Sequence, residues 1–349
     1  MISPTATVRE TLARINLSEG FALIVDEDRH LLGTVTDGDI RRAVLANINL
    51  EAPVQKLIDI RNRELYPTPV TAPAGTSPGD LLGLMTERLV RQVPLLDKQG
   101  RVVDLALLED LVKQHDLPLS AVVMAGGFGT RMRPLTDDFP KPMLPIGDKP
   151  VLQLIIEQLQ SAGISKVQLT THFKPDVIRK HFGDGKKFGV DLQYVNEDQP
   201  LGTAGALGLV PDINEPMLVL NGDVLTQVDF RALVAFHREH KAELTVGVRQ
   251  YDFQVPYGVV QCEGAEVQGV EEKPTLNFFV NAGIYLLEPS AHRSIPTGQK
   301  FDMTDLIGKL RSEGRRVVAF PVVEYWMDIG RHVDYEQAQE DVKTWKKTP

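Results

Sequence analysis

The hydrophobic positions after residue 119 follow two patterns that alternate along the chain. Short apolar runs, typical of buried strands, recur at Ala121–Ala125, Val167–Thr171, Met217–Leu220, Leu244–Val248, Ile284–Leu287 and Val317–Phe320. Between them lies a segment of helical period, Val151–Ala162, with apolar side chains on one face at Leu152, Ile155, Ile156 and Leu159 and with Gly163 as a C-cap. The alternation predicts an α/β domain with a mixed, mostly parallel sheet. Helices should cover both faces, and ligands should bind at the carboxyl ends of the strands.

The first 116 residues contain an internal repeat. In each copy an apolar run ends at an aspartate, Asp26 or Asp97, and a turn and a second apolar run lead to Asp39 or Asp110. Each copy therefore predicts a strand, a tight turn, a second strand and a helix that starts at the second aspartate. Residues 66–79, rich in Pro, Thr, Gly and Ser, are interpreted as a linker. Repeats this short cannot bury their apolar faces alone, so the copies should pack together as a small α+β unit over residues 1–116.

Composition and charge narrow the class of protein. The 349 residues suffice for about two domains, which we place at 1–116 and 119–349, joined by residues 113–119. A net charge of −9 argues against a nucleic-acid surface, which needs a basic face. No apolar stretch approaches the roughly 18 residues of a membrane span. With one cysteine, Cys262, and no secretory pattern at the start, a reducing, cytoplasmic compartment is expected.

A glycine-rich loop follows the first apolar run of the second domain. Gly126, Gly127 and Gly129 let backbone N–H groups approach an anion without an intervening Cβ. Clustered cations follow, at Arg131, Arg133 and Lys141. A strand, a glycine loop and clustered cations suit a nucleoside triphosphate. The loop has neither the Walker pattern nor the dinucleotide fingerprint, and taken alone it is also compatible with a plain turn.

The loop resembles the signature of the sugar nucleotidyltransferases, G-G-x-G-T-R-x-x-P-x-T followed by P-K-P-x-x-P, which Gly126–Thr136 and Pro140–Pro145 match without a break. Further blocks follow in the order of that family, at Glu197, Gln199–Leu207, Asn221–Val224, Glu272–Pro274, Asn281–Tyr285 and Trp326–Gly330. The resemblance covers about two-thirds of the chain, from Leu119 onward. It implies a Rossmann-like, GT-A-like nucleotidyltransferase domain without the appended acyltransferase β-helix of some family members.

The implied reaction transfers a nucleoside monophosphate from a nucleoside triphosphate to a sugar-1-phosphate and releases pyrophosphate. The product would be a nucleotide sugar of the kind used for cell-surface polysaccharides. The blocks Pro200–Leu207 and Trp326–Gly330 resemble the mannose-1-phosphate guanylyltransferase branch most, which favours GTP, while UTP, CTP and dTTP stay open. The alternative from another class is a nucleotide sensor whose transferase domain has lost activity.

The resemblance also implies roles for individual residues. Asp223 and Asp328 would hold Mg²⁺, whose preferred ligands are carboxylate and phosphate oxygens. Arg131 and Lys141 would hold the triphosphate and the leaving pyrophosphate, and Lys273 the sugar phosphate. The nucleotide would contact Ala125, Gly126, Gly127, Gly129, Thr130, Gly202 and Thr203. The sugar phosphate would contact Glu197, Glu272 and Asn281. The histidines have no metal-ligand spacing and are given no role.

The repeat resembles a pair of CBS motifs, in which a hydroxyl and an aspartate three residues apart hold an adenine nucleotide. Thr36 and Asp39 match in the first copy. In the second copy Asp110 matches, but Leu107 stands where the hydroxyl is needed. One nucleotide site is therefore expected, and a pair used only for packing and dimerisation is the alternative. A homo-oligomer is expected in either case.

Overall fold

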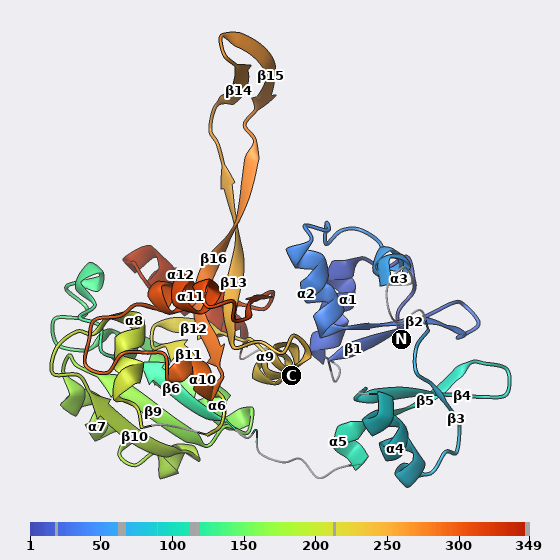
Figure 1. Cartoon of the computed structure of the whole chain (residues 1–349), viewed down its shortest axis with the longest axis horizontal. Helices are drawn as coiled ribbons and strands as arrows, with labels where there is room; N and C mark the ends of the chain where they lie inside the picture. The colour runs from blue at the N-terminus through green and yellow to red at the C-terminus, as the bar shows by residue number, and fades with distance from the viewer. Residues whose placement is uncertain are drawn as a thin grey trace. The chain divides into compact units, whose positions relative to one another are not determined.

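The computed structural model describes residues 1–17, 20–61, 68–88, 90–111, 117, 119–211 and 214–345 (Figure 1). The chain divides into two compact units, Met1–His115 and Asp116–Pro349. Most of the predicted connecting segment, residues 113–119, lies outside the described residues. None of the helices among the described residues is long and apolar enough to cross a membrane.

The first unit confirms the predicted repeat. Its first part consists of α1 (Val8–Leu17), β1 (Phe21–Val25), β2 (Leu31–Thr36), α2 (Asp37–Leu45) and α3 (Gln55–Arg61). Its second part consists of β3 (Ala72–Pro73), α4 (Pro78–Arg88), β4 (Gln92–Leu96), β5 (Val102–Leu107) and α5 (Leu108–Leu111). In both copies the helix after the second strand begins two residues before the predicted aspartate. The supposed linker contains structure, because Ala72–Pro73 pairs with β4 and Pro78 begins a helix.

The two copies share a core, as the repeat predicts. Phe21 and Leu23 of β1 lie in one buried cluster with Val102 and Leu107 of β5. The equivalent turns are also built alike. Backbone N–H groups of the turn donate to Oδ1 of Asp26 in the first copy and to Oδ1 of Asp97 in the second. These hydrogen bonds stabilise the ionised form and hold the pKa of both carboxyl groups below its usual value.

The second unit is built on a seven-stranded sheet of order β10-β9-β6-β11-β16-β13-β17. Its strands are β6 (Ser120–Met124), β9 (Lys166–Thr171), β10 (Asp191–Asn196), β11 (Met217–Asn221), β13 (Leu244–Gln254), β16 (Thr275–Leu287) and β17 (Val317–Pro321). β16 runs antiparallel to both neighbours and every other pairing is parallel. The predicted mostly parallel sheet is confirmed, with β10 as a strand that the apolar runs did not predict.

Helices cover both faces of this sheet. The even-numbered side chains Leu244 and Val246 of β13 belong to the buried cluster that contains Leu306 and Leu310 of α11 (Met303–Ser312). On the opposite face, Phe320 of β17 packs against Phe236 of α9 (Phe230–Glu239), with ring centroids 5.4 Å apart. The predicted helix appears as α6 (Val151–Ser161), which ends one residue earlier than expected.

The remaining elements are short or lie at the edges of the second unit. They are η1 (Thr130–Met132), η2 (Lys141–Met143), β7 (Pro145–Ile146), β8 (Lys149–Pro150), α7 (Pro175–Phe182), η3 (Lys186–Phe188), α8 (Gly202–Gly205), η4 (Ala206–Leu209), β12 (Val224–Thr226), β14 (Gly258–Glu263), β15 (Glu266–Glu272), α10 (Pro289–His292), β18 (Trp326–Asp328) and α12 (His332–Trp345).

An arm projects from the second unit, as Figure 1 shows. β13 and β16 leave the sheet together and stay paired as far as Gln254 and Thr275, and the β14–β15 hairpin forms the tip. We define the arm as residues 249–280. The predicted strands Leu244–Val248 and Ile284–Leu287 cover only the part within the sheet, because those runs are apolar on both faces whereas the arm is not.

Candidate active site

Four loops of the second unit begin at the same edge of the sheet. β10, β9, β6 and β11 are consecutive parallel strands, so their carboxyl ends meet there. The glycine loop follows β6, His172 follows β9, Glu197 follows β10 and Asp223 follows β11. Three of these four features were predicted to bind substrate or metal, and the sheet places all of them at one edge.

The two predicted metal ligands lie side by side through a small antiparallel pair. β12 pairs with β18 so that Val224 faces Asp328, and the backbone N–H of Ile329 donates to the carbonyl of Asp223 at 3.0 Å. Lys141, from η2, donates to Oδ2 of Asp223, and its Nζ lies 3.7 Å from Oδ1 of Asp328. Lys141 is only 8% exposed, so its ammonium group is held between two carboxylates away from bulk water.

The electrostatics of this cluster favour a further cation. Burial raises the pKa of Asp328, and the nearby charge of Asp223 raises it further. Lys141 and Arg131 act in the opposite direction on Asp328, so all four predicted residues interact electrostatically. Two adjacent carboxylates fit Mg²⁺, which takes few protein ligands and completes its shell with water and phosphate oxygens. No group of three or more His, Cys, Asp or Glu suited to a metal occurs in the described part of the chain.

Glu197 lies against the glycine loop. A Cβ at Gly126 would stand 2.7 Å from Oε1 of Glu197, so glycine at this position lets the carboxylate lie close against the loop. The other carboxylate oxygen accepts from the backbone N–H of Leu201 at 3.2 Å. Burial raises the pKa of this glutamate. The resemblance implied a place for Glu197 among the sugar-phosphate residues, but the structure groups it with the predicted nucleotide loop.

His172, which was given no role from the sequence, belongs to the same group. Its Nδ1 donates to the carbonyl oxygen of Glu197 at 2.7 Å, and its ring lies edge-on to Phe128, with centroids 5.2 Å apart. The histidine therefore fixes the backbone from which Glu197 projects. Its position directly after β9 was the available signal, because Asp223 and Glu197 also follow a parallel strand directly.

The other residues of the glycine loop stay together. Ala125 is buried and donates its N–H to the carbonyl of Thr170 at 2.9 Å. Gly129 accepts at its carbonyl from the hydroxyl of Thr136 at 2.8 Å, and Thr130 begins η1. A Cβ built at Gly127 would meet no atom within 4 Å, so this residue faces open space that a ligand can fill.

Gly202 and Thr203 face Asp302, at the start of α11. The backbone N–H of Thr203 donates to Oδ1 of Asp302 at 2.9 Å, and the Thr203 hydroxyl accepts from the N–H of Met303 at the same distance. Gly202 has φ +83°, and a Cβ there would stand 2.5 Å from Oδ1 of Asp302. The polar groups of Thr203 anchor this helix, and Leu201, the residue before the pair, donates its N–H to Glu197, the carboxylate that lies beside Gly126.

The three remaining predicted residues, Glu272, Lys273 and Asn281, lie at different positions along the arm. Asn281 lies at its base, where its amide donates to the hydroxyl of Tyr285 and accepts from the N–H of Gly283. Glu272 and Lys273 lie beyond the last ribbon pair, Gln254 with Thr275. The six residue-to-residue steps from Asn281 to Thr275, at about 3.3 Å each, span roughly 20 Å along the ribbon. The structure therefore does not bring Lys273 and Glu272 to the cluster of Lys141 and Asp223.

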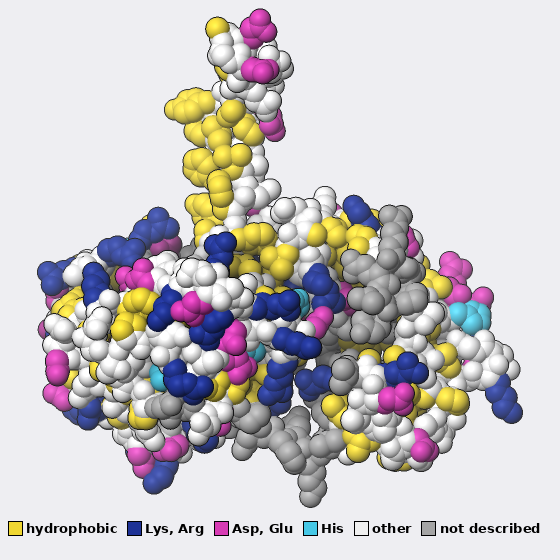
Figure 2. Space-filling view, viewed as in Figure 1, with side chains coloured by type: hydrophobic (Ala, Val, Ile, Leu, Met, Phe, Trp, Pro, Cys, Tyr) yellow, Lys and Arg dark blue, Asp and Glu magenta, His cyan; other side chains and the backbone are white. Residues whose placement is uncertain are grey.

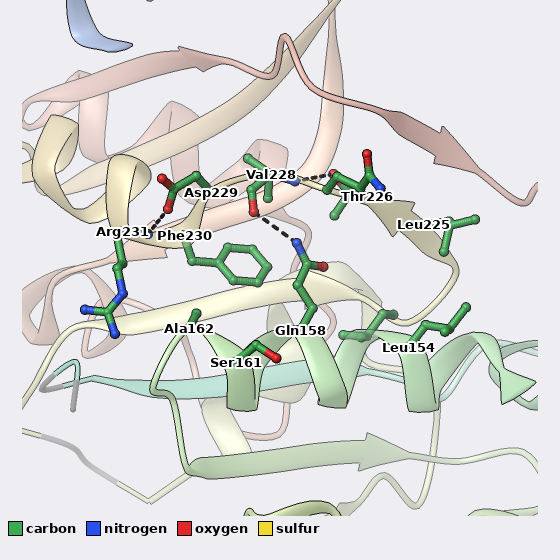
Figure 3. Close-up of a pocket in the computed structure, with 12 residues that line it drawn as sticks. Leu154, Gln158, Ser161, Ala162, Leu225, Thr226, Val228, Asp229, Phe230 and Arg231 are labelled. Carbon is green, nitrogen blue, oxygen red and sulfur yellow. Dashed lines mark hydrogen bonds between the residues drawn. The ribbon is translucent and has the colours of Figure 1, made fainter. Parts of the chain in front are cut away.

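A separate pocket of about 540 Å³ lies between α6 and residues 225–231 (Figure 3). Figure 3 shows the side chain of Gln158 reaching across it, where its amide donates to the carbonyl of Val228 at 3.0 Å. Asp229 stands at the far side, where its carboxylate caps α9. None of the residues that line this pocket is a predicted site residue.

In the first unit, the side chains of Thr36 and Asp39 hydrogen-bond to each other. Oδ2 of Asp39 accepts from the N–H and the hydroxyl of Thr36, each at 2.8 Å, which forms the capping box of α2. Oδ1 of Asp39 accepts from Arg42 at 2.7 Å. Asp110 lies exposed on the four-residue helix α5. Asp39 is thus held in the cap of α2 whereas Asp110 lies exposed, and the asymmetry expected between the two copies as nucleotide sites stays a prediction.

Both units match the sequence profiles of known protein families. The profile of the nucleotidyl transferase family matches residues 120–344. The chain belongs to this family. The profile of the CBS domain matches residues 1–46 and 63–115 in the first unit.

Relatives within the family differ in the nucleotide that their names give. The chain is 36% identical to a probable mannose-1-phosphate guanylyltransferase 3 of Oryza sativa subsp. japonica, over 62% of this chain and 63% of the relative. It is 34% identical to the mannose-1-phosphate guanylyltransferase of Mycobacterium tuberculosis, over 64% of each. It is also 34% identical to a UTP–glucose-1-phosphate uridylyltransferase of Synechocystis, over 63% of this chain and 62% of the relative. The chain thus spans less than two-thirds of the length of these relatives.

Solved structures share the fold of the second unit. A putative glucose-1-phosphate thymidylyltransferase from Bacillus anthracis matches with a TM-score of 0.53 and 25% identity, over 64% of this chain and 95% of that one. HddC from Yersinia pseudotuberculosis, complexed with GMP-PN, matches with a TM-score of 0.51 and 25% identity, over 64% of this chain and 99% of that one.

Proposed function

We propose that this protein transfers a nucleoside monophosphate from a nucleoside triphosphate to a sugar-1-phosphate, releasing pyrophosphate. The observation that carries the proposal is the placement of Lys141 between Asp223 and Asp328, beside the glycine loop of a nucleotidyl transferase fold. Both substrates are anions, so neutralising and aligning their phosphates is the main chemical problem. The cluster supplies cations and carboxylates at the one sheet edge where the loop begins.

Each residue of the cluster has a distinct task in this proposal. Bound Mg²⁺, held by Asp223 and Asp328, would stabilise negative charge at the α-phosphate. Lys141, which donates to Asp223, would neutralise the triphosphate, and exposed Arg131 would neutralise the leaving pyrophosphate. The open space beside Gly127 would admit the nucleotide.

GTP is the proposed nucleoside triphosphate, because the carboxylate of Glu197 can accept hydrogen bonds from guanine. Guanine presents two adjacent donors, N1–H and N2–H, on one edge, and a carboxylate offers two acceptors that match them. Uracil and thymine present a donor between two acceptors and do not match. Mannose-1-phosphate is the proposed partner substrate, because several of the relatives carry that name.

A pyrophosphate-release assay with four nucleoside triphosphates and a panel of hexose-1-phosphates tests this function. We expect Mg²⁺-dependent release that is greatest with GTP and mannose-1-phosphate. Release with no combination would favour the alternative of an inactive nucleotide sensor. Release with a different pair would keep the reaction class and refute the proposed base or sugar.

Although the arm holds Lys273 apart from the Lys141 cluster, the resemblance implies that Lys273 contacts the sugar phosphate, so Lys273→Ala should weaken use of the sugar-1-phosphate more than use of the triphosphate. Separate titration of each substrate measures the two effects, and Glu271→Ala, next to it on the arm, is the matched control. Loss of a charge-assisted hydrogen bond predicts about a tenfold rise in KM for the sugar-1-phosphate. A defect confined to the triphosphate would reverse the assignment, and unchanged KM values would exclude Lys273 from the site.

We also propose that the first unit binds one adenine nucleotide beside Thr36 and Asp39. Asp39→Ala should reduce affinity by about tenfold or more, since a carboxylate can accept from two ribose hydroxyls. Calorimetric titration of the full chain with ATP and AMP measures this, and Asp110→Ala is the control in the second copy. Thermal melting separates lost affinity from the lost cap of α2, which costs about 1 kcal/mol. Two equivalent sites, or equal effects of the two substitutions, would refute the asymmetry.

A further inference from the structure

The arm has one apolar face and one polar face. In an antiparallel ribbon, directly paired residues share a face, and successive residues alternate between faces. Tyr251 pairs with Phe278 and Phe253 pairs with Leu276, so these four side chains share one face. The next pair between them, Asp252 with Asn277, lies on the opposite face. Figure 2 shows the resulting apolar strip along the arm.

The hairpin at the tip has exposed apolar side chains of its own. Val260 pairs with Val270, and Cys262 pairs with Val267, so the β14–β15 hairpin also gathers apolar side chains on one face. Its other face pairs Val259 with Glu271 and ends in the pair Glu263 with Glu266. The apolar residues are strongly exposed, up to 74% for Tyr257 and 66% for Val270.

We expect another surface to pack against an exposed apolar strip of this kind. A two-stranded ribbon is at best marginally stable in water, and monomers rarely expose apolar patches beyond about 300–600 Å². Tyr251, Phe253 and Phe278 are about half exposed. At roughly 100 Å² each, half of what an aromatic side chain buries, these three offer about 300 Å² on the shared face. Leu276 adds to this area on the same face, and the exposed valines of the tip add apolar area to the arm.

We propose that the apolar face of the arm docks against the same face of a second copy of this chain, forming a dimer. The face is suited to self-association, because no charged side chain interrupts it between Tyr251 and Leu276, and a two-fold contact therefore opposes no like charges. The opposite face, which also holds Phe279, carries Asp252, whose apposition in two copies would be repulsive.

The geometry of the ribbon indicates that the second unit, from which the arm projects, does not itself cover the apolar face of the arm. The pairing has its only irregularity between Val246 and Val248, inside the sheet, and then runs in unbroken register to Gln254. Arg249 fixes the base of the arm, where its guanidinium donates to the carbonyl oxygens of Val322 and Glu324. The arm therefore leaves the sheet as a continuous ribbon and presents its apolar face to a separate surface.

Sedimentation velocity of the full chain over a range of concentrations tests the proposal. The wild type should form a dimer, and Tyr251→Ser with Phe278→Ser should raise its dissociation constant about 30-fold or more, the effect of losing a hot spot. The matched control is Asp252→Ser with Asn277→Ser, the neighbouring pair on the polar face, which should leave the dimer intact. A monomer at every concentration would overturn the proposal, as would equal behaviour of the two double variants.

A second measurement keeps the test decisive if the apolar double variant does not fold. In a Cys262→Ser background, Tyr251→Cys or Phe253→Cys should give disulfide-linked dimers on mild oxidation, with the better yield nearest the two-fold axis. Asp252→Cys or Gln254→Cys, on the opposite face, should not. Cross-linking that does not distinguish the two faces would contradict docking through the apolar face.

Discussion

Asp223→Asn is expected to lower Mg²⁺-dependent turnover about a hundredfold or more, while the protein stays folded. The substitution removes the charge that holds the metal, and losing a metal ligand should cost roughly 3 kcal/mol of transition-state stabilisation. Asparagine keeps an acceptor for the ammonium group of Lys141, which is nearly buried and would lose its main partner in an alanine variant. Steady-state kinetics over a Mg²⁺ titration, with thermal melting as the check on folding, measures the effect.

Asp137→Asn is the control for this experiment. Asp137 is an exposed carboxylate in the segment between the glycine loop and Lys141, where it lies 3.4 Å from Arg133. Its substitution removes the same charge without touching the proposed metal site, so turnover should stay close to that of the wild type. If Asp223→Asn also retained near-wild-type turnover at every Mg²⁺ concentration, Asp223 would have no part in the mechanism.

Glu197→Gln is expected to reduce kcat/KM for GTP by roughly 10- to 100-fold, relative to the other nucleoside triphosphates. A glutamine side chain offers one acceptor and one donor, so it can no longer accept from both N1–H and N2–H of guanine. Its acceptor oxygen can still receive the N–H of Leu201, and the side chain keeps its size beside Gly126. Competition assays with paired triphosphates measure the change in preference directly.

Asp198→Asn, at the exposed neighbour of Glu197, should leave this preference unchanged. An equal loss of activity with every triphosphate in Glu197→Gln would show that Glu197 supports the loop without reading the base. No loss with GTP would remove the physical argument for guanine and leave only the names of the relatives.

Local patterns predicted the elements of the second unit well. The apolar runs located six of the seven sheet strands, and the helical period located α6 to within one residue. Both patterns depend on side chains close together in the sequence, whose spacing decides which face they share. They failed at β10, Asp191–Asn196, where polar residues interrupt the apolar ones, and on the arm, where the apolar run ends although the strands continue.

The repeat was also visible in the sequence, because its copies are alike in their turns and strands. The shared core of Phe21 and Val102 follows from the same reasoning, since each copy alone leaves an apolar face open. The interpretation of residues 66–79 as a linker was wrong in part, because tertiary pairing with β4 makes a strand of Ala72–Pro73 despite the flanking proline and glycine.

The sequence by itself thus determined the α/β class, the repeat and the candidate residues of the glycine loop, because these depend on local spacing and on motifs. Only the tertiary structure decided which candidates meet. The pairing of β12 with β18 brings Asp328 beside Asp223, and the parallel order of β10, β9 and β6 brings Glu197 to Gly126. The same structure carries Lys273 away on the arm. Contacts between distant segments depend on strand order and register, which no local pattern encodes.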